Sequence, residues 1–411
     1  MKKQYLSKDE VQMVREILPV LLTILLSISG TVVGGGSAGG GEGDLTIVLM
    51  GDIVFNGNLG RLAETQGDEY PFEEVLPHIE DADIILANLE GPISDRGTPE
   101  ENKYSTFRMD PRSIRSLEYA GIDAVSLSNN HCLDYGPDAL NDTLIYLDEA
   151  GIGHAGIFYG EDIGNATIER PVIITSGGIT LGFLAYTEDV RGHWKADADF
   201  PGPLPLDRDL MEDDIRTSSN LVDILVVSIH WRKWPQYTEG PEPSDIELCH
   251  DVVDWGADIV MGHGPHTVHE VEGYGDSLVL YSLGNAQMDT GNDTSDLSYI
   301  ARVRIVEGNI EGLELVPTYK KSYRYIPMGT PVERNPVTGL NVSREEVMMM
   351  YEDDIYGRVD DEWSRNDPRM LFATAPWYLR VLLVLLLISV AAALFVLVLT
   401  IRKRTSSGRE R

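Results

Sequence analysis

The chain has 411 residues, enough for one or two domains with a substantial core. Aspartate and glutamate total 66 against 33 lysines and arginines, which gives a formal net charge of −33. Such an acidic surface repels nucleic acids and other polyanions except where a metal ion or local arginines reverse the field, so we expect no nucleic-acid binding. Two cysteines, Cys132 and Cys249, make neither a disulfide framework nor a zinc-type C-x-x-C pair, and we expect both in the core.

The N-terminal segment, residues 1–33, has the features of a signal peptide or a signal anchor. Lys2, Lys3 and Arg15 precede an apolar run that proline, serine and glycine interrupt and that is short for a membrane span. Cleavage would leave one membrane helix in the chain, and retention would leave two. The glycine-rich residues 34–43 predict a flexible linker.

Residues 44–317 form the predicted main domain, in which strand-like apolar runs alternate with amphipathic helix-like segments. The strand-like runs are residues 45–50, 83–87, 124–127, 179–186, 223–229, 258–261 and 277–282. The predicted helices include residues 111–120, 137–150 and 244–255. This alternation favours an α/β fold with parallel strands. Residues 297–306 and 310–316, separated by Glu307-Gly308-Asn309, predict a β-hairpin in a mixed or second sheet.

The C-terminal part predicts a membrane anchor. We expect residues 318–376 to be a stalk or cover, irregular apart from a helical patch at 343–351. Residues 381–401 carry no charge and are rich in leucine and valine, enough at about 1.5 Å per residue to cross a bilayer core, so residues 377–401 predict a transmembrane helix. The basic tail, residues 402–411, begins Arg402-Lys403-Arg404 and is expected in the cytoplasm, which places residues 34–376 outside it.

Five of the predicted strands end in side chains that bind metals or protons. These are Asp52, Glu90, Asn130 with His131, His230, and His263 with His266. Each has an ordinary structural alternative, such as a helix cap, a solvated loop acid, a core histidine or a turn residue. Strand ends of an α/β sheet converge, however, and five such endings together favour a metal site. Mixed nitrogen and oxygen ligands suit manganese, iron or zinc better than calcium, and six ligands suit two ions about 3.5–4 Å apart.

The same motifs, in this order, resemble the CapA/PgsA family of capsule and poly-γ-glutamate biosynthesis, within the calcineurin-like metallophosphoesterase superfamily. They are Gly51-Asp52, Asn88-Leu89-Glu90, Ser128-Asn129-Asn130-His131 with Asp134 and Gly136, His230-Trp231, Gly262-His263-Gly264-Pro265-His266 and Tyr281-Ser282-Leu283-Gly284-Asn285. The resemblance covers about residues 45–306. It implies a metallophosphoesterase-like two-sheet αββα sandwich holding two divalent metal ions. The implied ligands are Asp52, Glu90, Asn130, His230, His263 and His266, with His131 as the proton donor to the leaving group.

Two positions depart from the pattern. Val54 stands where the superfamily usually has a histidine, as in the CapA branch, and Arg232-Lys233-Trp234 follow His230-Trp231 in place of a glycine and an acid. Arg232 and Lys233 are therefore candidates to bind a phosphate or carboxylate of the substrate, although solvated loop charges explain them equally well.

The expected function is a membrane-anchored, extracytoplasmic hydrolase of the phosphoesterase type that acts in making a capsule or another anionic surface polymer. Activated water would attack a phosphorus or a carbonyl carbon, and His131 would protonate the departing group. Asp134 would either orient His131 or cap the following helix. The alternative function is a non-catalytic assembly or export subunit that works with other membrane proteins of polymer synthesis. The sequence leaves the substrate, phosphoester or amide chemistry, and the oligomeric state open.

Overall fold

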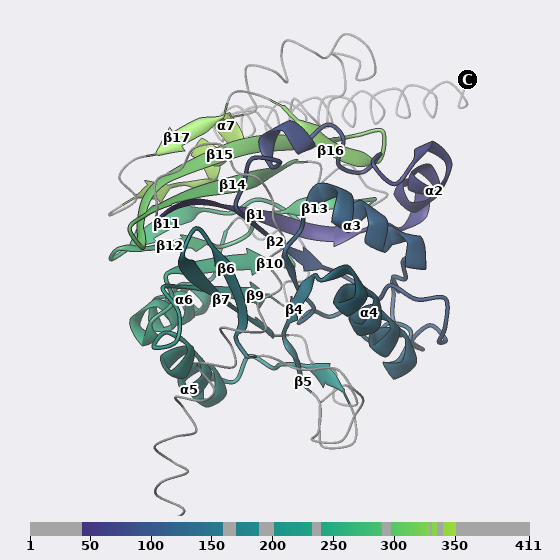
Figure 1. Ribbon diagram of the computed structural model, residues 1–411, viewed down its shortest axis with the longest axis horizontal. Coiled ribbons are helices and arrows are strands. Elements are labelled where there is room, and N and C mark those ends of the chain that lie inside the picture. Colours follow the sequence, from purple (N-terminus) through teal and green to yellow (C-terminus); the bar gives the residue numbers. More distant parts are fainter. Residues whose placement is uncertain are drawn as a thin grey trace, which may run out of the picture. The chain divides into compact units, whose positions relative to one another are not determined.

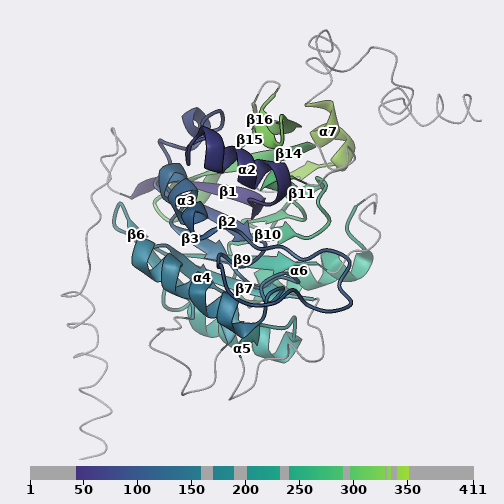
Figure 2. The same cartoon turned by 90° about the vertical axis from the view of Figure 1, so that its right-hand side faces the viewer.

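Two β-sheets pack face to face in the computed structural model, and helices cover the outer face of each sheet (Figures 1 and 2). The structure describes residues 43–158, 170–188, 201–231, 240–289, 297–328, 331–334 and 340–350. Outside these lie the predicted N-terminal segment, most of the linker, Arg232 and Lys233, and everything from residue 351 onward, including the predicted membrane helix and basic tail. Among the helices that fall within the described residues, none has the length and apolar character of a membrane span.

The first sheet is mixed and, within the described residues, contains nine strands. Its order is β16 (Arg324–Pro327), β15 (Asn309–Lys321), β14 (Leu297–Val306), β1 (Asp44–Val54), β2 (Ile84–Leu89), β3 (Ala124–Ser126) and β4 (Gly153–Ala155), with β13 (Asn285–Met288) paired to β1 and β17 (Val332–Arg334) paired to β15. Strands β1 to β4 run parallel, as the alternating pattern predicted. The predicted hairpin is confirmed, since β14 and β15 pair antiparallel and β14 also pairs antiparallel with β1.

The second sheet contains seven strands within the described residues. Its order is β18 (Asn341–Val342), β11 (Val271–Tyr274), β12 (Ser277–Leu280), β10 (Ile259–His263), β9 (Ile224–His230), β7 (Ile179–Thr187) and β6 (Val172–Ser176). The central strands β7, β9, β10 and β12 are parallel. A short antiparallel pair, β5 (Ile157–Phe158) with β8 (Gly202–Pro203), stands apart from both sheets.

Three apolar cores define the layers. The core between the sheets is formed by buried side chains of both, such as Ile47 and Leu86 from the first and Phe183 and Met261 from the second. The outer face of the first sheet is covered by α2 (Gly57–Gln66), α3 (Ile114–Ala120) and α4 (Pro137–Ala150), and that of the second by α5 (Arg208–Ser218) and α6 (Pro243–Trp255). The two-sheet α/β part of the predicted fold is thereby confirmed.

Helix boundaries follow the sequence signals closely. Helix α4 has the predicted bounds, and α6 begins one residue before the predicted start. The predicted segment 111–120 divides into a 3-10 turn, η2 (Pro111–Ser113), and α3; a further 3-10 turn is η1 (Leu76–His78). Cys132 and Cys249 are buried and unpaired among the described residues, as expected of core cysteines.

The described part of residues 318–350 contributes strands to both sheets, where we expected irregular structure. Strands β16 and β17 pair with β15 in the first sheet, and β18 pairs with β11 in the second. The helical patch is present as α7 (Arg344–Met349). These strands are short and lie at or beside sheet edges, where polar residues are tolerated and the apolar alternation of a buried strand is missing.

Four parallel strands are each preceded directly by an aspartate that makes two hydrogen bonds to the neighbouring strand. The backbone N–H of each aspartate donates to a carbonyl, and its carboxylate accepts the N–H of that same neighbouring residue. The pairs are Asp83 with Thr46, Asp123 with Ile85, Asp223 with Thr180 and Asp258 with Leu225. These bonds satisfy backbone groups at the strand starts and fix how neighbouring strands are aligned, which decides where their opposite ends meet.

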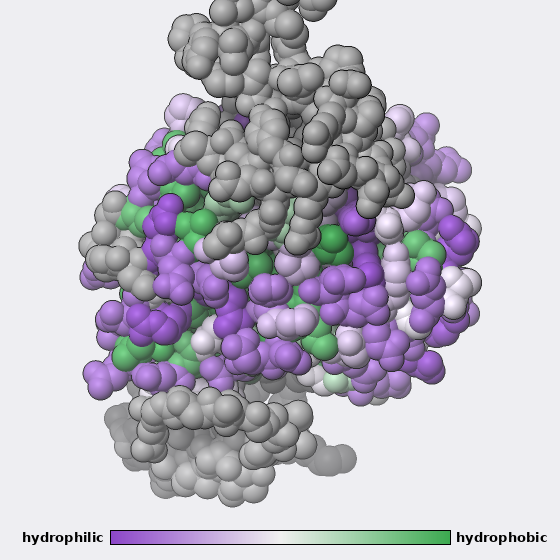
Figure 3. All heavy atoms as spheres, turned by 90° about the horizontal axis from the view of Figure 1, so that it is seen from above, coloured by the Kyte–Doolittle hydropathy of each residue, from purple (hydrophilic) through white to green (hydrophobic). Residues whose placement is uncertain are grey.

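On the face shown in Figure 3, the described residues are mostly hydrophilic, and the hydrophobic ones form small separate groups. This surface agrees with the acidic composition of the chain.

Candidate metal centre

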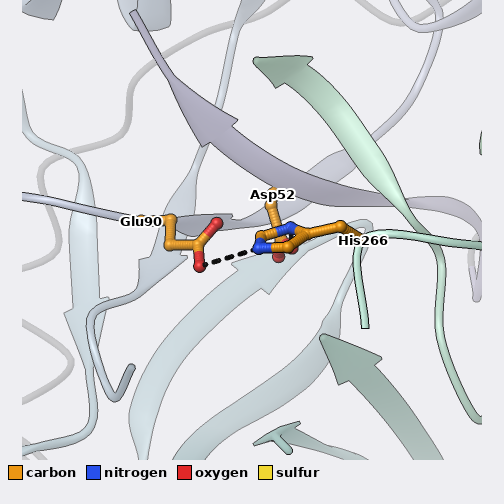
Figure 4. Close-up of side chains that lie close together, drawn as sticks. All are labelled: Asp52, Glu90 and His266. Atoms are coloured by element: carbon orange, nitrogen blue, oxygen red, sulfur yellow. Dashed lines mark ion pairs between the residues drawn. The ribbon is translucent and has the colours of Figure 1, made fainter. Parts of the chain in front are cut away.

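The predicted strand-end residues come from both sheets. Asp52 lies near the end of β1, and Glu90 follows β2 directly. His230 and His263 are the last residues of β9 and β10, and His266 follows three residues later. Ligand atoms of Asp52, Glu90 and His266 all lie within 4.8 Å of one another. Figure 4 shows the Glu90 carboxylate directed at the His266 ring, with 3.7 Å between Oε1 and Nε2.

Glycines beside these residues allow the close backbone approach that builds the site. A Cβ on Gly51 would lie 2.0 Å from the carbonyl oxygen of Gly284, and one on Gly262 would lie 2.0 Å from that of Tyr281. The backbone N–H of Asp52 donates to the same Gly284 carbonyl at 3.1 Å. The segment 281–285 therefore packs directly against β1 and β10, and any side chain at either glycine would separate them.

Asp52 accepts hydrogen bonds from both sheets. Its Oδ1 accepts from Nδ2 of Asn88 at 2.8 Å and lies 3.0 Å from Nδ1 of His263, while Oδ2 lies 3.2 Å from Nδ1 of His266. Burial would raise the pKa of the Asp52 carboxyl, but the neighbouring imidazoles of His263 and His266 hold this pKa well below its ordinary value. Asp52 is therefore a carboxylate although it is fully buried.

The charges around His266 favour a cation at this place. Burial would lower the pKa of the imidazole, whereas the charges of Glu90 and Asp52 raise it, to about 9. A positive charge between the two carboxylates offsets their repulsion and their loss of solvation. A divalent ion would supply that charge in place of a proton.

Buried polar atoms without a hydrogen-bond partner occur on five of the six predicted ligands. Within the described residues these atoms are Asp52 Oδ2, Glu90 Oε2, Asn130 Oδ1, His230 Nδ1 and His263 Nε2. Buried polar atoms nearly always have a hydrogen-bond partner. Five unpartnered atoms on side chains that are expected to bind the same metal ions therefore call for an explanation. Oxygen and imidazole nitrogen are the donors that manganese, iron and zinc accept, so the residues present fit such ions.

The remaining predicted ligands are placed less tightly. His230 Nε2 lies 3.3 Å from Glu90 Oε1, so β9 is tied to the end of β2. Asn130 Oδ1 has no hydrogen-bond partner in the part of the chain that the structure describes. Arg232 and Lys233 lie outside the described residues, so their predicted substrate contacts stay predictions.

His131 lies beside this group and is held on three sides. Its Nδ1 is 2.6 Å from Asp134 Oδ2, its ring stacks on Phe107 with centroids 4.1 Å apart, and its Nε2 is 3.9 Å from Glu90 Oε1. Burial lowers the pKa of the imidazole, while Asp134 opposes that change. Of the two roles considered for Asp134, the geometry favours orienting His131, because the residue at the N-cap of α4 is Gly136.

Three residues that sequence reasoning did not single out complete the arrangement. Asn129 donates to Asn88 Oδ1 at 3.1 Å and accepts the His131 backbone N–H at 3.0 Å, and Asn88 donates in turn to Asp52. Lys103 reaches Asp134 from a loop. Asn88 and Asn129 lie inside the quoted motifs, so their position could have flagged them, whereas nothing in the local sequence marks Lys103.

Comparison with known proteins identifies relatives. The family model described as bacterial capsule synthesis protein PGA_cap matches residues 46–290. The capsule biosynthesis protein CapA of Bacillus anthracis is 25% identical over 333 residues, covering 79% of this chain and 77% of the relative. The PGA biosynthesis protein CapA of Bacillus subtilis is 25% identical over 274 residues, covering 66% of this chain and 71% of the relative.

Solved structures give weaker similarities. A 5'-nucleotidase precursor from Thermus thermophilus is 12% identical with a TM-score of 0.40, covering 77% of this chain and 60% of that one. The calcineurin-like phosphoesterase YfkN from Bacillus subtilis is 14% identical with a TM-score of 0.34, covering 77% and 97%. Because the family match spans more than half of the sequence, this chain belongs to the bacterial capsule synthesis protein PGA_cap family, as the resemblance implied.

Proposed function

We propose that this chain is a metal-dependent hydrolase of the phosphoesterase type that acts in the synthesis of a capsule or a poly-γ-glutamate-like polymer. The observation that carries the proposal is the meeting of Asp52, Glu90 and His266 beside an oriented His131. The names of the Bacillus relatives, which refer to capsule and PGA biosynthesis, support the biological setting.

Two divalent ions, manganese, iron or zinc, would be held by the six strand-end residues. The ligands in this proposal are Asp52, Glu90, Asn130, His230, His263 and His266. When bound, such ions lower the pKa of water and offset the negative charge of phosphoester oxygens. The chain contributes two buried acidic side chains, Asp52 and Glu90, which are in position before substrate arrives.

His131 is the proposed proton donor to the leaving group. Asp134 accepts from Nδ1, so Nε2 is the ring nitrogen left to exchange a proton, and Nε2 faces Glu90. The stacked Phe107 ring keeps the imidazole in this orientation and shields it from water. Fixing the tautomer and the direction of the ring is what makes a histidine an effective general acid.

Placement and substrate contacts complete the proposal. The predicted helix at 377–401 would anchor the chain in the cell membrane, with the basic tail in the cytoplasm and the main domain outside it. Arg232 and Lys233 would bind an anionic group of the substrate. The proposed partners are the membrane, an anionic polymer or phosphoester, and other membrane subunits of polymer synthesis. Protease added to intact cells should then cut the main domain, and full protection of this domain beside a cleaved surface control would refute the topology.

The activity is tested with the full chain purified in detergent and supplied with Mn²⁺, against phosphoesters and γ-glutamyl polymers. Hydrolysis that falls by about 10²–10⁴-fold in His131→Asn and stays intact in His78→Asn, which changes a histidine outside the centre, would support the enzyme. Two results together would instead support the assembly subunit. The purified wild-type chain would bind metal but cleave none of these substrates, and cells that carry His131→Asn would make a normal amount of polymer.

A further inference from the structure

Residues 91–110, which connect β2 to the helical segment η2 and α3, contain a buried lysine that lies beside Nδ1 of His131. Lys103 has a side chain only 7% exposed. Its ammonium group contacts Oδ1 of Asp134 and the backbone carbonyl of Asn130, and lies 3.0 Å from Nδ1 of His131. Lysine is almost never buried to this degree without paired charges, so the position calls for an explanation.

Hydrogen-bond chemistry assigns the donors in this group. The ammonium of Lys103 has only donors, so it donates to Asp134 Oδ1 and to the Asn130 carbonyl. The neighbouring Nδ1 of His131 then carries its own hydrogen and donates to Asp134 Oδ2, 2.6 Å away. The backbone N–H of Phe107 also donates to Oδ2, at 2.6 Å. Both oxygens of the Asp134 carboxylate are therefore engaged, and the carboxylate is held against rotation.

The same loop holds the His131 imidazole in two ways, through a hydrogen bond at the edge of the ring and through stacking on its face. Lys103 and the Phe107 N–H set the plane of the carboxylate that receives Nδ1–H, and the Phe107 ring stacks on the imidazole. A further bond, from the Glu100 N–H to the Asp134 carbonyl at 2.7 Å, ties the loop to the turn that carries both residues. Oriented second partners of this kind set the tautomer and direction of a working histidine.

We propose that Lys103 is a positioning residue for His131 and acts through Asp134. This inference rests on the proposed hydrolytic function, in which His131 protonates the leaving group. Lys103 would then matter most when the leaving group is poor and needs that proton, and it would matter little for binding substrate or metal.

The test compares two phosphomonoesters that differ in the leaving group. Phenol leaves less readily than p-nitrophenol, so phenyl phosphate depends more on a proton donor than p-nitrophenyl phosphate does. With Mn²⁺ and the full chain, Lys103→Met and Lys103→Gln should lower kcat on phenyl phosphate by about 10–100-fold and on p-nitrophenyl phosphate by clearly less, with KM and bound metal unchanged. Lys103→Arg, which keeps charged donors, should restore most of the activity.

Arg115→Met is the matched control, because Arg115 has a side chain 63% exposed and lies outside the centre. It should retain wild-type kcat on both esters. Wild-type kcat in Lys103→Gln, an equal loss on both esters, or loss of bound metal would overturn the proposal. If Lys103→Met fails to fold, Lys103→Gln, whose neutral amide can still form hydrogen bonds in the buried site, decides the outcome alone.

A readout independent of activity separates this inference from the proposed function. In nitrogen-15 histidine-labelled protein, the His131 ring signals are those missing from the spectrum of His131→Asn. They should shift in Lys103→Gln and stay in place in Arg115→Met. If the wild-type chain cleaves neither ester, the proposed function fails by itself; unshifted ring signals in Lys103→Gln would overturn the role of Lys103.

Discussion

The two sheets of this protein supply different chemistry to one site. Strand ends of the first sheet bring the oxygen donors Asp52 and Glu90, whereas strand ends of the second bring the imidazoles of His230 and His263, with His266 just beyond. Contacts such as His263 to Asp52 and His230 to Glu90 cross from one sheet to the other. Neither sheet alone brings these side chains together, so the candidate site depends on the packing of the two sheets.

The largest expected effect comes from removing a carboxylate of the first sheet. Asp52→Ala leaves the imidazoles without their neighbouring anion and removes one proposed metal ligand, so bound metal should fall and turnover should drop by about 10³-fold or more. Elemental analysis and kinetics on the same preparation measure both. Asp83→Asn, at the opposite end of the neighbouring strand β2, should keep its metal, and equal metal loss in both variants would contradict the assignment.

Replacing a histidine of the second sheet should reduce metal binding less than replacing Asp52. In His263→Ala one neutral donor is lost, while the carboxylates of Asp52 and Glu90 remain. We expect weaker metal binding that excess Mn²⁺ restores, seen as a higher metal concentration needed for half-maximal activity. A loss that excess metal cannot restore would show that the two sheets contribute alike.

His131→Asn should separate proton donation from metal binding. The variant loses the proposed general acid but none of the proposed ligands, so turnover should fall by about 10²–10⁴-fold at unchanged metal content. Loss of metal in this variant would instead make His131 a ligand.

Packing between the sheets should matter to the site more than packing on the outside. Phe183→Ala in the core between the sheets and Leu144→Ala on α4 should each lower the free energy of unfolding by roughly 2–5 kcal/mol. Only Phe183→Ala should also weaken metal affinity, because the ligands lie on both sides of that core. Denaturant unfolding with and without Mn²⁺ checks this, and equal metal affinity in the two variants would contradict it.

The smallest effect contrasts two strand-start aspartates, one in each sheet. Burial raises the pKa of Asp123 to about 6, so the stability it contributes is greatest below its ordinary pKa and falls as pH rises through 6. Asp223 has its pKa lowered by hydrogen bonds from Thr180, so its contribution is present above its ordinary pKa and is lost as pH falls.

As the pH rises from 4 to 7, the free energy of unfolding of Asp123→Asn should therefore increase relative to that of the wild type, by about 1–3 kcal/mol. Asp223→Asn should show the opposite slope, most destabilised at pH 7 and least in acid. Urea unfolding across this pH range measures both variants, and parallel slopes would contradict the assigned environments.

The sequence predicted the strands and strand ends of both sheets better than it predicted the connections between them. Apolar runs that end in glycine and a polar residue, such as Gly51-Asp52 and Gly262-His263, carry both the strand and the ligand in a few neighbouring residues. Lys103 could not be found in this way, because it lies 31 positions before Asp134, with α3 and β3 between them, and only the folded chain brings the two side chains together.

The strands after residue 318 were missed for a different reason. Strands β16 to β18 are short and polar, and pairing with β15 and β11 rather than their own pattern stabilises them. By contrast, β14 and β15 have long apolar runs around a turn, and their hairpin was predicted with the correct bounds for β14 and with an end for β15 that is five residues too early. The formation of an edge strand depends on the strand it pairs with, whereas a central strand can be predicted from its own apolar sequence.

Metal stoichiometry tests the central claim, that the two sheets together form a metal centre, most directly. Elemental analysis of the gently purified full chain, after manganese or iron is offered, should find about two divalent ions per chain. The Asp52→Ala and His263→Ala variants, one from each sheet, should both hold less at limiting metal. A folded wild-type chain that binds no metal under these conditions would contradict the account.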